Sequence, residues 1–150
     1  MPQSLANIMV HVVFSTKERT PSITPEIQPE LHAYMAAVLQ KLGCIVLEIG
    51  GMPDHVHLLF QLPRDRTVSE LVKDVKTSSS RWMKEGPPKS PGFHWQGGYG
   101  AFSVGPSVLD DTRRYIREQA KHHERRTFKD EFRALLEKWG IDHDEAYAWD

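Results

Sequence analysis

The order of strands and helices is the feature that most constrains the fold of this chain. Short runs rich in β-branched residues, such as IMVHVVF at 8–14 and CIVLEI at 44–49, predict strands because they are too short for typical helices. Longer segments with apolar residues at helical spacing separate them. The turn residues GGMPD at 50–54 predict a reversal of the chain before the third strand. The expected strands are 8–14, 44–49, 55–62 and 99–104.

Helix start and stop signals mark four helices. A capping box, Thr67 to Glu70, is typical of a helix N-terminus, because the two side chains satisfy free backbone N–H groups. Glycine commonly follows the last helical turn. We also expect Ser107, together with Asp110, to cap the third helix. The four helices are expected to start near Thr24, Thr67, Ser107 and Thr127, and all but the third have a glycine stop, at Gly43, Gly86 and Gly140 respectively.

The resulting order, β-α-β-β-α-β followed by two helices, is that of a ferredoxin-like α+β fold. In such architectures helices cover one face of an antiparallel sheet. We therefore predict helices on one face, the other face free for a ligand, and two C-terminal helices, the first of which carries Tyr115. The 150 residues are the length of one ordinary domain, so residues 1–150 are expected to form a single domain.

Composition and charge narrow the class of protein. The single cysteine, Cys44, rules out an internal disulfide framework and favours a reducing cytoplasm. No apolar stretch is long enough to span a bilayer, so no membrane association is expected. A net charge of −1 lacks the basic signature of many nucleic-acid binders, but residues 113–126 carry six arginines and lysines against two glutamates. That stretch suits phosphate binding and is equally consistent with a solvated helix face.

Two histidines on the third expected strand are candidate metal ligands. Alternate strand residues share a face, so His55 and His57 point to the side opposite the apolar Val56 and Leu58. Two neighbouring imidazoles can share one metal and leave positions for substrate oxygens. The alternative is a pair of solvent-facing strand residues. Parity therefore predicts both imidazoles on the free face of the sheet.

A tyrosine on the third helix is the candidate nucleophile. Tyr115 and Gln119 are four residues apart and share a helix face. Tyrosine has an ordinary pKa of about 10, so it needs cations to stabilise the phenolate. Arginines at 113, 114 and 117 are expected to supply them. The alternative for Tyr115 is a buried structural aromatic, and Tyr99 is a weaker candidate nucleophile.

Other polar residues are candidates for DNA contact. His11 lies on the strand that neighbours the His55 strand in a ferredoxin-like order, so it can reach the same face, and Glu48 has the same parity on the second strand. Basic side chains on the second and third helices suit a DNA backbone, although a polar outer face explains them equally well. The residues expected to contact DNA are His11, Arg113, Arg114, Arg117, Lys121, Lys73, Lys76 and Arg81.

Three segments resemble the insertion-sequence-200/605 transposases, single-tyrosine members of the HUH nuclease group that also includes the REP-associated tyrosine transposases. The segments are PDHVHLLF at 53–60, WQGGYGAFSVG at 95–105 and RRYIREQ at 113–119. The resemblance implies that His55, His57 and Gln119 bind magnesium or manganese. It implies that Tyr115 attacks single-stranded DNA at hairpin-bearing ends and forms a 5′-phosphotyrosine link. It also implies a homodimer in which Tyr115 can complete the partner's site.

The residues leave several alternatives open. Imidazole ligands suit zinc as well as the ions that the resemblance implies. His122 and His123 lie three and four residues beyond Gln119 and can compete with it as third ligand. A metal-dependent phosphoesterase with a water nucleophile would use the same histidines. A domesticated, non-catalytic binder of folded single-stranded DNA would need no nucleophile.

Overall fold

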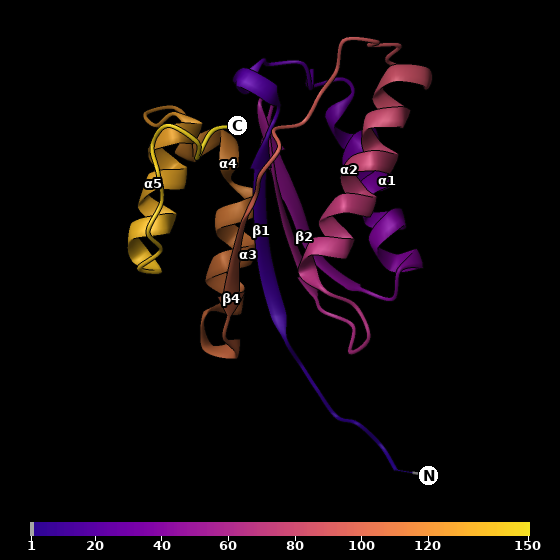
Figure 1. Cartoon of the computed structure of the whole chain (residues 1–150), viewed down its shortest axis with the longest axis vertical. Helices are drawn as coiled ribbons and strands as arrows, with labels where there is room; N and C mark the ends of the chain where they lie inside the picture. The colour runs from indigo at the N-terminus through magenta and orange to yellow at the C-terminus, as the bar shows by residue number, and fades with distance from the viewer. Residues whose placement is uncertain (1) are drawn as a thin grey trace.

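The computed structural model describes residues 2–150 (Figure 1). Four antiparallel strands form one sheet in the order β2-β3-β1-β4, which confirms the predicted ferredoxin-like α+β fold. The strands are β1 (Met9–Ser15), β2 (Ile45–Met52), β3 (His55–Gln61) and β4 (Gly100–Val104). The helices are α1 (Gln28–Lys41), α2 (Val68–Glu85), α3 (Leu109–Arg117), α4 (Gln119–His122) and α5 (Phe128–Lys138). Two short 3-10 helices are η1 (Lys17–Arg19) and η2 (Pro106–Val108).

Helices α1 and α2 cover one face of the sheet with a continuous apolar core. Val12 and Phe14 of β1 and Leu58 of β3 project into it. Helix α2 meets them with an apolar stripe that includes Leu71 and Val75. Burial of such side chains is favourable by roughly 1.5–3 kcal/mol each, which makes this face the main source of stability.

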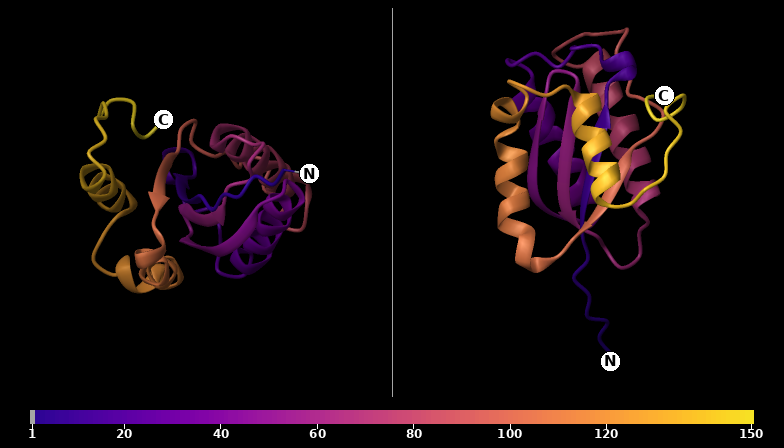
Figure 2. Two further views of the ribbon diagram at one scale, coloured as in Figure 1. Left: turned by 90° about the horizontal axis from the view of Figure 1, so that it is seen from below. Right: turned by 90° about the vertical axis from the view of Figure 1, so that its left-hand side faces the viewer.

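The second face of the sheet is also covered, and the expectation of a free face is wrong. Helix α5 packs across β1 and β4 through an apolar cluster that includes Phe102, Phe128 and Phe132. Helix α3 packs along β2, and its Ile116 is fully buried against Leu59 of β3. Figure 2 shows α1 and α2 on one side of the sheet and α5 on the other. The sheet is enclosed because α5 carries its own apolar stripe.

Close packing fixes the position of α3 on the sheet. A side chain at Gly50 of β2 would collide with the backbone carbonyl oxygen of Ile116, so only glycine permits this approach. The predicted cap by Ser107 is wrong, because Ser107 lies inside the turn η2 that Pro106 begins and makes no capping hydrogen bond. The helix also breaks at Glu118, where the backbone leaves helical geometry before α4 begins.

Other predicted helix ends are confirmed. The Thr67 and Thr127 side chains accept hydrogen bonds from the backbone N–H groups of residues 70 and 130. Gly43 ends the first helix with a positive φ of 97°. Helix α1 starts at Gln28, later than expected, because a separate turn at Thr24 precedes it. Within residues 2–150, no helix combines the length and apolar character needed to cross a membrane.

Candidate metal centre and nucleophile

The two histidines of β3 lie side by side in the interior, on the face opposite the main apolar core. His55 and His57 are both fully buried, because α3, α4 and α5 close over them. Each imidazole is held at its Nδ1 atom. Asp54 Oδ1 lies 2.7 Å from Nδ1 of His55, and His11 Nε2 lies 2.8 Å from Nδ1 of His57. Both Nε2 atoms are thereby oriented toward a common point, as in metal sites whose histidines are fixed by outer partners.

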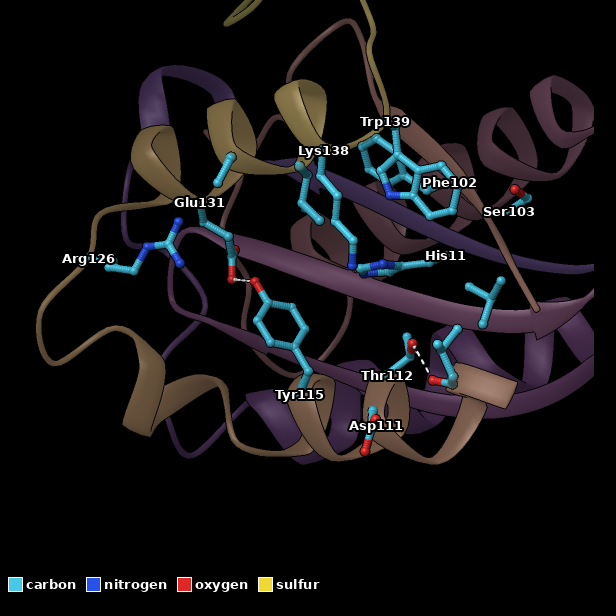
Figure 3. A pocket seen from close by; sticks show the side chains of 14 residues that line it. His11, Phe102, Ser103, Asp111, Thr112, Tyr115, Arg126, Glu131, Lys138 and Trp139 are labelled. Carbon is cyan, nitrogen blue, oxygen red and sulfur yellow. Dashed lines mark hydrogen bonds between the residues drawn. The ribbon is translucent and has the colours of Figure 1, made fainter. Parts of the chain in front are cut away.

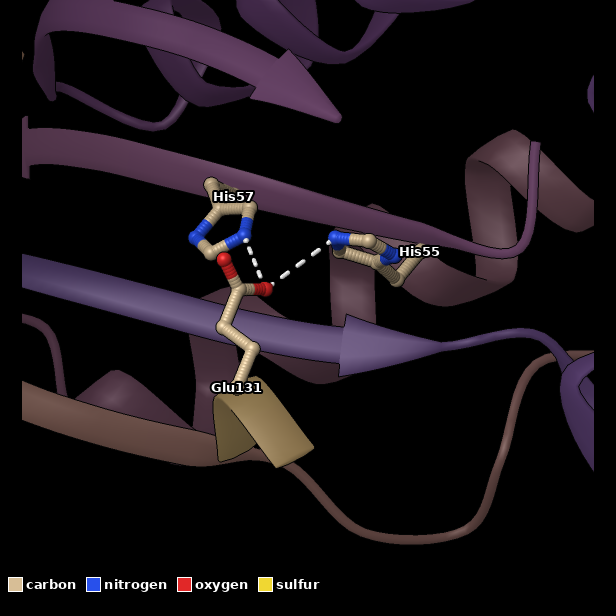
Figure 4. A group of neighbouring side chains, drawn as sticks. All are labelled: His55, His57 and Glu131. Atoms are coloured by element: carbon tan, nitrogen blue, oxygen red, sulfur yellow. Dashed lines mark hydrogen bonds and ion pairs between the residues drawn. The ribbon is translucent and has the colours of Figure 1, made fainter. Parts of the chain in front are cut away.

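Glu131 of α5 lies close to both Nε2 atoms, and it is not among the site residues predicted from the sequence. Its Oε1 atom lies 3.2 Å from Nε2 of His55 and 3.0 Å from Nε2 of His57 (Figure 4). The carboxylate is 2% exposed. One sequence signal was available, because position 131 falls within the apolar stripe formed by Phe128, Phe132 and Leu135. A carboxylate on the buried stripe of an amphipathic helix marks a candidate site.

Gln119 also reaches the histidines despite the break before it. Its Oε1 atom lies 2.9 Å from Nε2 of His55, and its Nε2 donates to Glu131 Oε2 at 3.1 Å. His123 Nε2 lies 3.2 Å from Glu131 Oε1, and no hydrogen bond satisfies this buried nitrogen. His122 instead packs its ring 4.8 Å from that of Tyr115. Gln119 and His123 therefore converge on the histidine pair, and His122 does not.

The spacing of these atoms fits a divalent ion. Ligand atoms about 2.0–2.2 Å from a metal stand roughly 3 Å from one another. Nε2 of His55 lies 2.9 Å from Gln119 Oε1 and 3.2 Å from Glu131 Oε1, and Nε2 of His57 lies 3.0 Å from the same Glu131 oxygen. His123 offers one further nitrogen that lacks a hydrogen-bond partner. His55, His57 and Glu131 form the candidate metal-binding triad of the described residues, and Gln119 is a neighbouring donor.

Tyr115 meets the same carboxylate from the other side. Its hydroxyl donates a short hydrogen bond to Glu131 Oε2 (Figure 3). Its ring lies 5.7 Å from that of His57. Burial raises the pKa of the Tyr115 phenol above its ordinary value, and the adjacent Glu131 carboxylate raises it further. In this arrangement Tyr115 is a neutral hydrogen-bond donor.

The three arginines of α3 do not surround the phenol. Arg113 and Arg117 share one helix face and lie 3.6 and 3.0 Å from Glu48 Oε1 on β2. Arg114 is exposed and pairs with Asp111. The expectation that these cations stabilise a phenolate is wrong, because the helix directs them to the β2 edge. Arg126, in the loop before α5, is the cation whose charge opposes part of the rise in the pKa of Tyr115.

The two histidines differ in charge. Burial alone would lower the pKa of His55, but hydrogen bonds with Asp54 and Glu131 outweigh it and raise the pKa to about 9. Burial lowers the pKa of His57. Burial would raise the pKa of Glu131, but its close interactions with His123, His55 and His57 hold that pKa far below the usual range. Without metal, a protonated His55 therefore faces an ionised Glu131.

The remaining candidates lie on other surfaces. Lys76 donates to the backbone carbonyls of Gln96 and Gly98 at 2.7 and 2.8 Å, so its ammonium group is used within the chain. Lys73 lines a cavity of about 500 Å³ with Lys76 and Tyr99, on the α2 side of the molecule. Tyr99 is thus separated from the histidines by the sheet. Arg81 and Lys121 are exposed, and His11 is buried at the sheet.

Two solved structures that are similar to this chain are described as transposases. The crystal structure of a protein described as a transposase from Deinococcus radiodurans R1 has a TM-score of 0.63 and 24% identity, and the match covers 79% of this chain and 98% of that one. A REP-associated tyrosine transposase bound to a REP hairpin has a TM-score of 0.62 and 13% identity, with 82% and 72% covered. The fold is therefore one that transposases have.

Sequence comparison gives the family. Residues 4–119 match the family model described as IS200-like transposase. The ISDra2 transposase TnpA of Deinococcus radiodurans is 25% identical over 114 residues, which cover 73% of this chain and 81% of that protein. This chain belongs to the IS200-like transposase family, in agreement with the resemblance found in its sequence. The family match ends at Gln119, so Glu131 lies beyond it.

Proposed function

We propose that this transposase cleaves and rejoins single-stranded DNA at hairpin-bearing element ends, with Tyr115 as the nucleophile. One observation carries the proposal: the Tyr115 hydroxyl and the imidazoles of His55 and His57 meet on a single buried carboxylate. A nucleophile beside a metal site is the arrangement that phosphoryl transfer requires.

The metal ligands in this proposal are His55, His57 and Gln119, as the resemblance implies, joined by Glu131. Imidazoles and oxygens suit several divalent ions, and we propose magnesium or manganese. A bound divalent cation would polarise the phosphodiester and offset the negative charge of Glu131. Asp54 and His11 would keep the imidazoles oriented, because each holds a nitrogen that faces away from the centre.

In the cleavage step, the Tyr115 oxygen attacks phosphorus and the bond to the 3′-oxygen breaks. The products are a 5′-phosphotyrosine and a free 3′-hydroxyl. The reverse attack by a 3′-hydroxyl rejoins the strand, so no hydrolysis is needed. Glu131 Oε2 is the acceptor nearest to the phenol proton, and Gln119 Nε2 holds this oxygen in place. Glu131 therefore connects the nucleophile with the metal ligands.

The DNA substrate is proposed from relatives and surface charge. A relative of the same fold is described as bound to a REP hairpin, and we extend a hairpin-bearing single strand to this chain. The exposed Arg81 and Lys121 are available for phosphate contacts, and the exposed Arg114 becomes available when it leaves Asp111. Lys73 joins them at the rim of its cavity. Arg113 and Arg117 first have to leave Glu48.

The placement of Tyr115 supports assembly of the site within one subunit. Its hydroxyl reaches Glu131 of the same chain, and Glu131 reaches the histidines of that chain. A homodimer remains a prediction from the family resemblance. In our proposal each subunit of such a dimer would hold a complete site.

A covalent trapping experiment tests the function. Purified protein with manganese is incubated with single-stranded oligonucleotides that carry the hairpins flanking its gene. We expect a protein-DNA adduct on denaturing gels that is absent in Tyr115→Phe and in chelator. Tyr99→Phe is the matched control, because it removes the same hydroxyl on the other side of the sheet. An adduct that survives Tyr115→Phe would refute the role of Tyr115.

Two outcomes would point to the alternative functions. Turnover of nucleotides or DNA without an adduct would indicate a metal phosphoesterase with a water nucleophile. Tight hairpin binding that is unchanged by chelator and by Tyr115→Phe, with no cleavage, would indicate a non-catalytic DNA binder.

A further inference from the structure

A cavity of about 400 Å³ lies directly beside the candidate nucleophile. It is bounded by β4, α3 and α5, and its inner end is formed by Tyr115, Glu131 and His11 (Figure 3). This volume is within the range of small-molecule pockets. Because the Tyr115 hydroxyl faces the cavity, a group bound there would adjoin the phosphate that Tyr115 attacks.

One wall of the cavity is an exposed aromatic platform. Trp139, at the end of α5, stacks on Phe102 of β4 with ring centroids 6.1 Å apart and an interplanar angle of 27°. Phe102 is buried in the apolar cluster under α5, whereas Trp139 is 42% exposed. The indole therefore packs against Phe102 and stays partly open to solvent. A rigid, half-covered indole is a stacking surface for a nucleobase, since every base has an aromatic face.

Two cations stand at the ends of the same cavity. Lys138 extends toward His11, and Arg126 lies beside Tyr115 and Glu131 (Figure 3). In residues 2–150, neither side chain forms an ion pair with a carboxylate, although Arg126 donates a hydrogen bond to the backbone carbonyl of Asp130. Asp111 also lines the cavity, but it pairs with Arg114. Lys138 and Arg126 therefore favour an anion at the rim of the cavity.

We propose that this cavity binds one unpaired nucleotide of the DNA strand, with its base on Trp139 and a phosphate beside Lys138. A nucleotide is the occupant because it combines an aromatic ring with a negative charge, which match the platform and the cations. The base must be unpaired, because a base inside a duplex does not expose its face. The inference rests on the proposed function, since it seats a nucleotide next to the bond that Tyr115 breaks.

Binding to defined oligonucleotides tests the platform without catalysis. The probes are a 12-residue oligothymidylate and a strand of equal length made of abasic sites, both titrated against full-length protein in chelator. We expect Trp139→Ala to weaken oligothymidylate binding by about 5- to 150-fold. The same change should leave abasic-strand binding nearly unaltered. Trp139→Phe should retain most of the preference, and Tyr147→Ala, which removes a 70% exposed aromatic, should retain all of it.

The preference for bases over abasic sites is a ratio within one variant, so partial loss of folding cancels from it. An unchanged ratio in Trp139→Ala would overturn the proposal. Lys138→Gln provides a second test: the slope of log affinity against log salt should fall by about 0.7, the value for one lost phosphate contact on a single strand. Lys41→Gln, on the opposite face, is the matched control. Equal slopes for the two variants would also contradict the proposal.

These binding results separate the inference from the proposed function. Binding that depends on Trp139, without any adduct on Tyr115, would support the nucleotide site and refute the proposed cleavage reaction. An adduct in the wild type, with no dependence on Trp139 in binding or in adduct yield, would retain the reaction and refute the nucleotide site.

Discussion

The two faces of the sheet bury different kinds of side chain. Toward α1 and α2 the strands present side chains such as Val12, Leu58 and Phe60, which bury apolar area without polar groups to satisfy. Toward α3, α4 and α5 the same strands present buried imidazoles, and Glu131 adds a buried carboxylate. Buried polar groups are unfavourable unless they are paired. One face therefore stabilises the fold. The other holds a site that the fold tolerates because His55, His57, Gln119 and Glu131 are hydrogen-bonded to one another.

The largest expected effect is a loss of activity when a histidine on the polar face of the sheet is replaced. His57→Ala removes an imidazole and should lower the rate of adduct formation about 1000-fold or more, because the metal would be lost or misplaced. Adduct yield on denaturing gels, with manganese in excess, measures it. His143→Ala, which changes an exposed histidine near the C-terminus, is the control. A rate within tenfold of wild type would show that His57 is not a ligand.

Leu58 is the neighbour of His57 and points to the opposite face, so it should give the reverse pattern. Leu58→Ala should cost about 2–5 kcal/mol of unfolding free energy, because it leaves a cavity in the apolar core. The adduct rate per folded molecule should stay near that of wild type. Urea unfolding and the trapping assay measure the two quantities. A selective loss of activity without loss of stability would contradict the division between the faces.

A smaller effect, on metal affinity, is expected when Asp54, which contacts His55, is replaced. Asp54→Asn keeps the shape of the side chain but removes the charge from the group that contacts Nδ1. Manganese affinity should fall about 10- to 100-fold. Isothermal titration calorimetry measures it, with Asp65→Asn in the loop before α2 as the control. Equal affinities for the two variants would exclude Asp54 from positioning the imidazole.

The smallest effect concerns the pH dependence of the metal-free protein. The pKa of His55 is raised from 6.5 to about 9, so its contribution to stability is fully present below pH 6.5 and lost as pH rises toward 9. Unfolding free energy in chelator should therefore fall over this interval. The fall should be shallower in Asp54→Asn, because one of the interactions that raise the pKa is weakened. Parallel profiles for the two proteins would contradict this origin.

Local patterns in the sequence predict much of the fold and half of the site. Strand parity places His55 and His57 together, and the four-residue spacing brings Gln119 to them even though α3 breaks before it. Tertiary packing decides the rest. Glu131 enters the site only because α5 folds back over the sheet. The spacing of residues within α5 does not predict which face of the sheet the helix will cover. The same packing hides the face that the strand pattern leaves open.

A subunit-mixing experiment tests most directly whether one chain contains a whole site. Tyr115→Phe protein is mixed with His57→Ala protein under conditions that exchange subunits, with hairpin-bearing single-stranded DNA and manganese. Because Tyr115 bonds to Glu131 of its own chain, and Glu131 contacts His55 and His57 of that chain, we expect no adduct above the level of either variant alone. Mixtures of each variant with wild type should retain the adduct. Adduct formation restored by mixing the two variants would contradict this expectation, since Tyr115 would then act on the metal site of a partner.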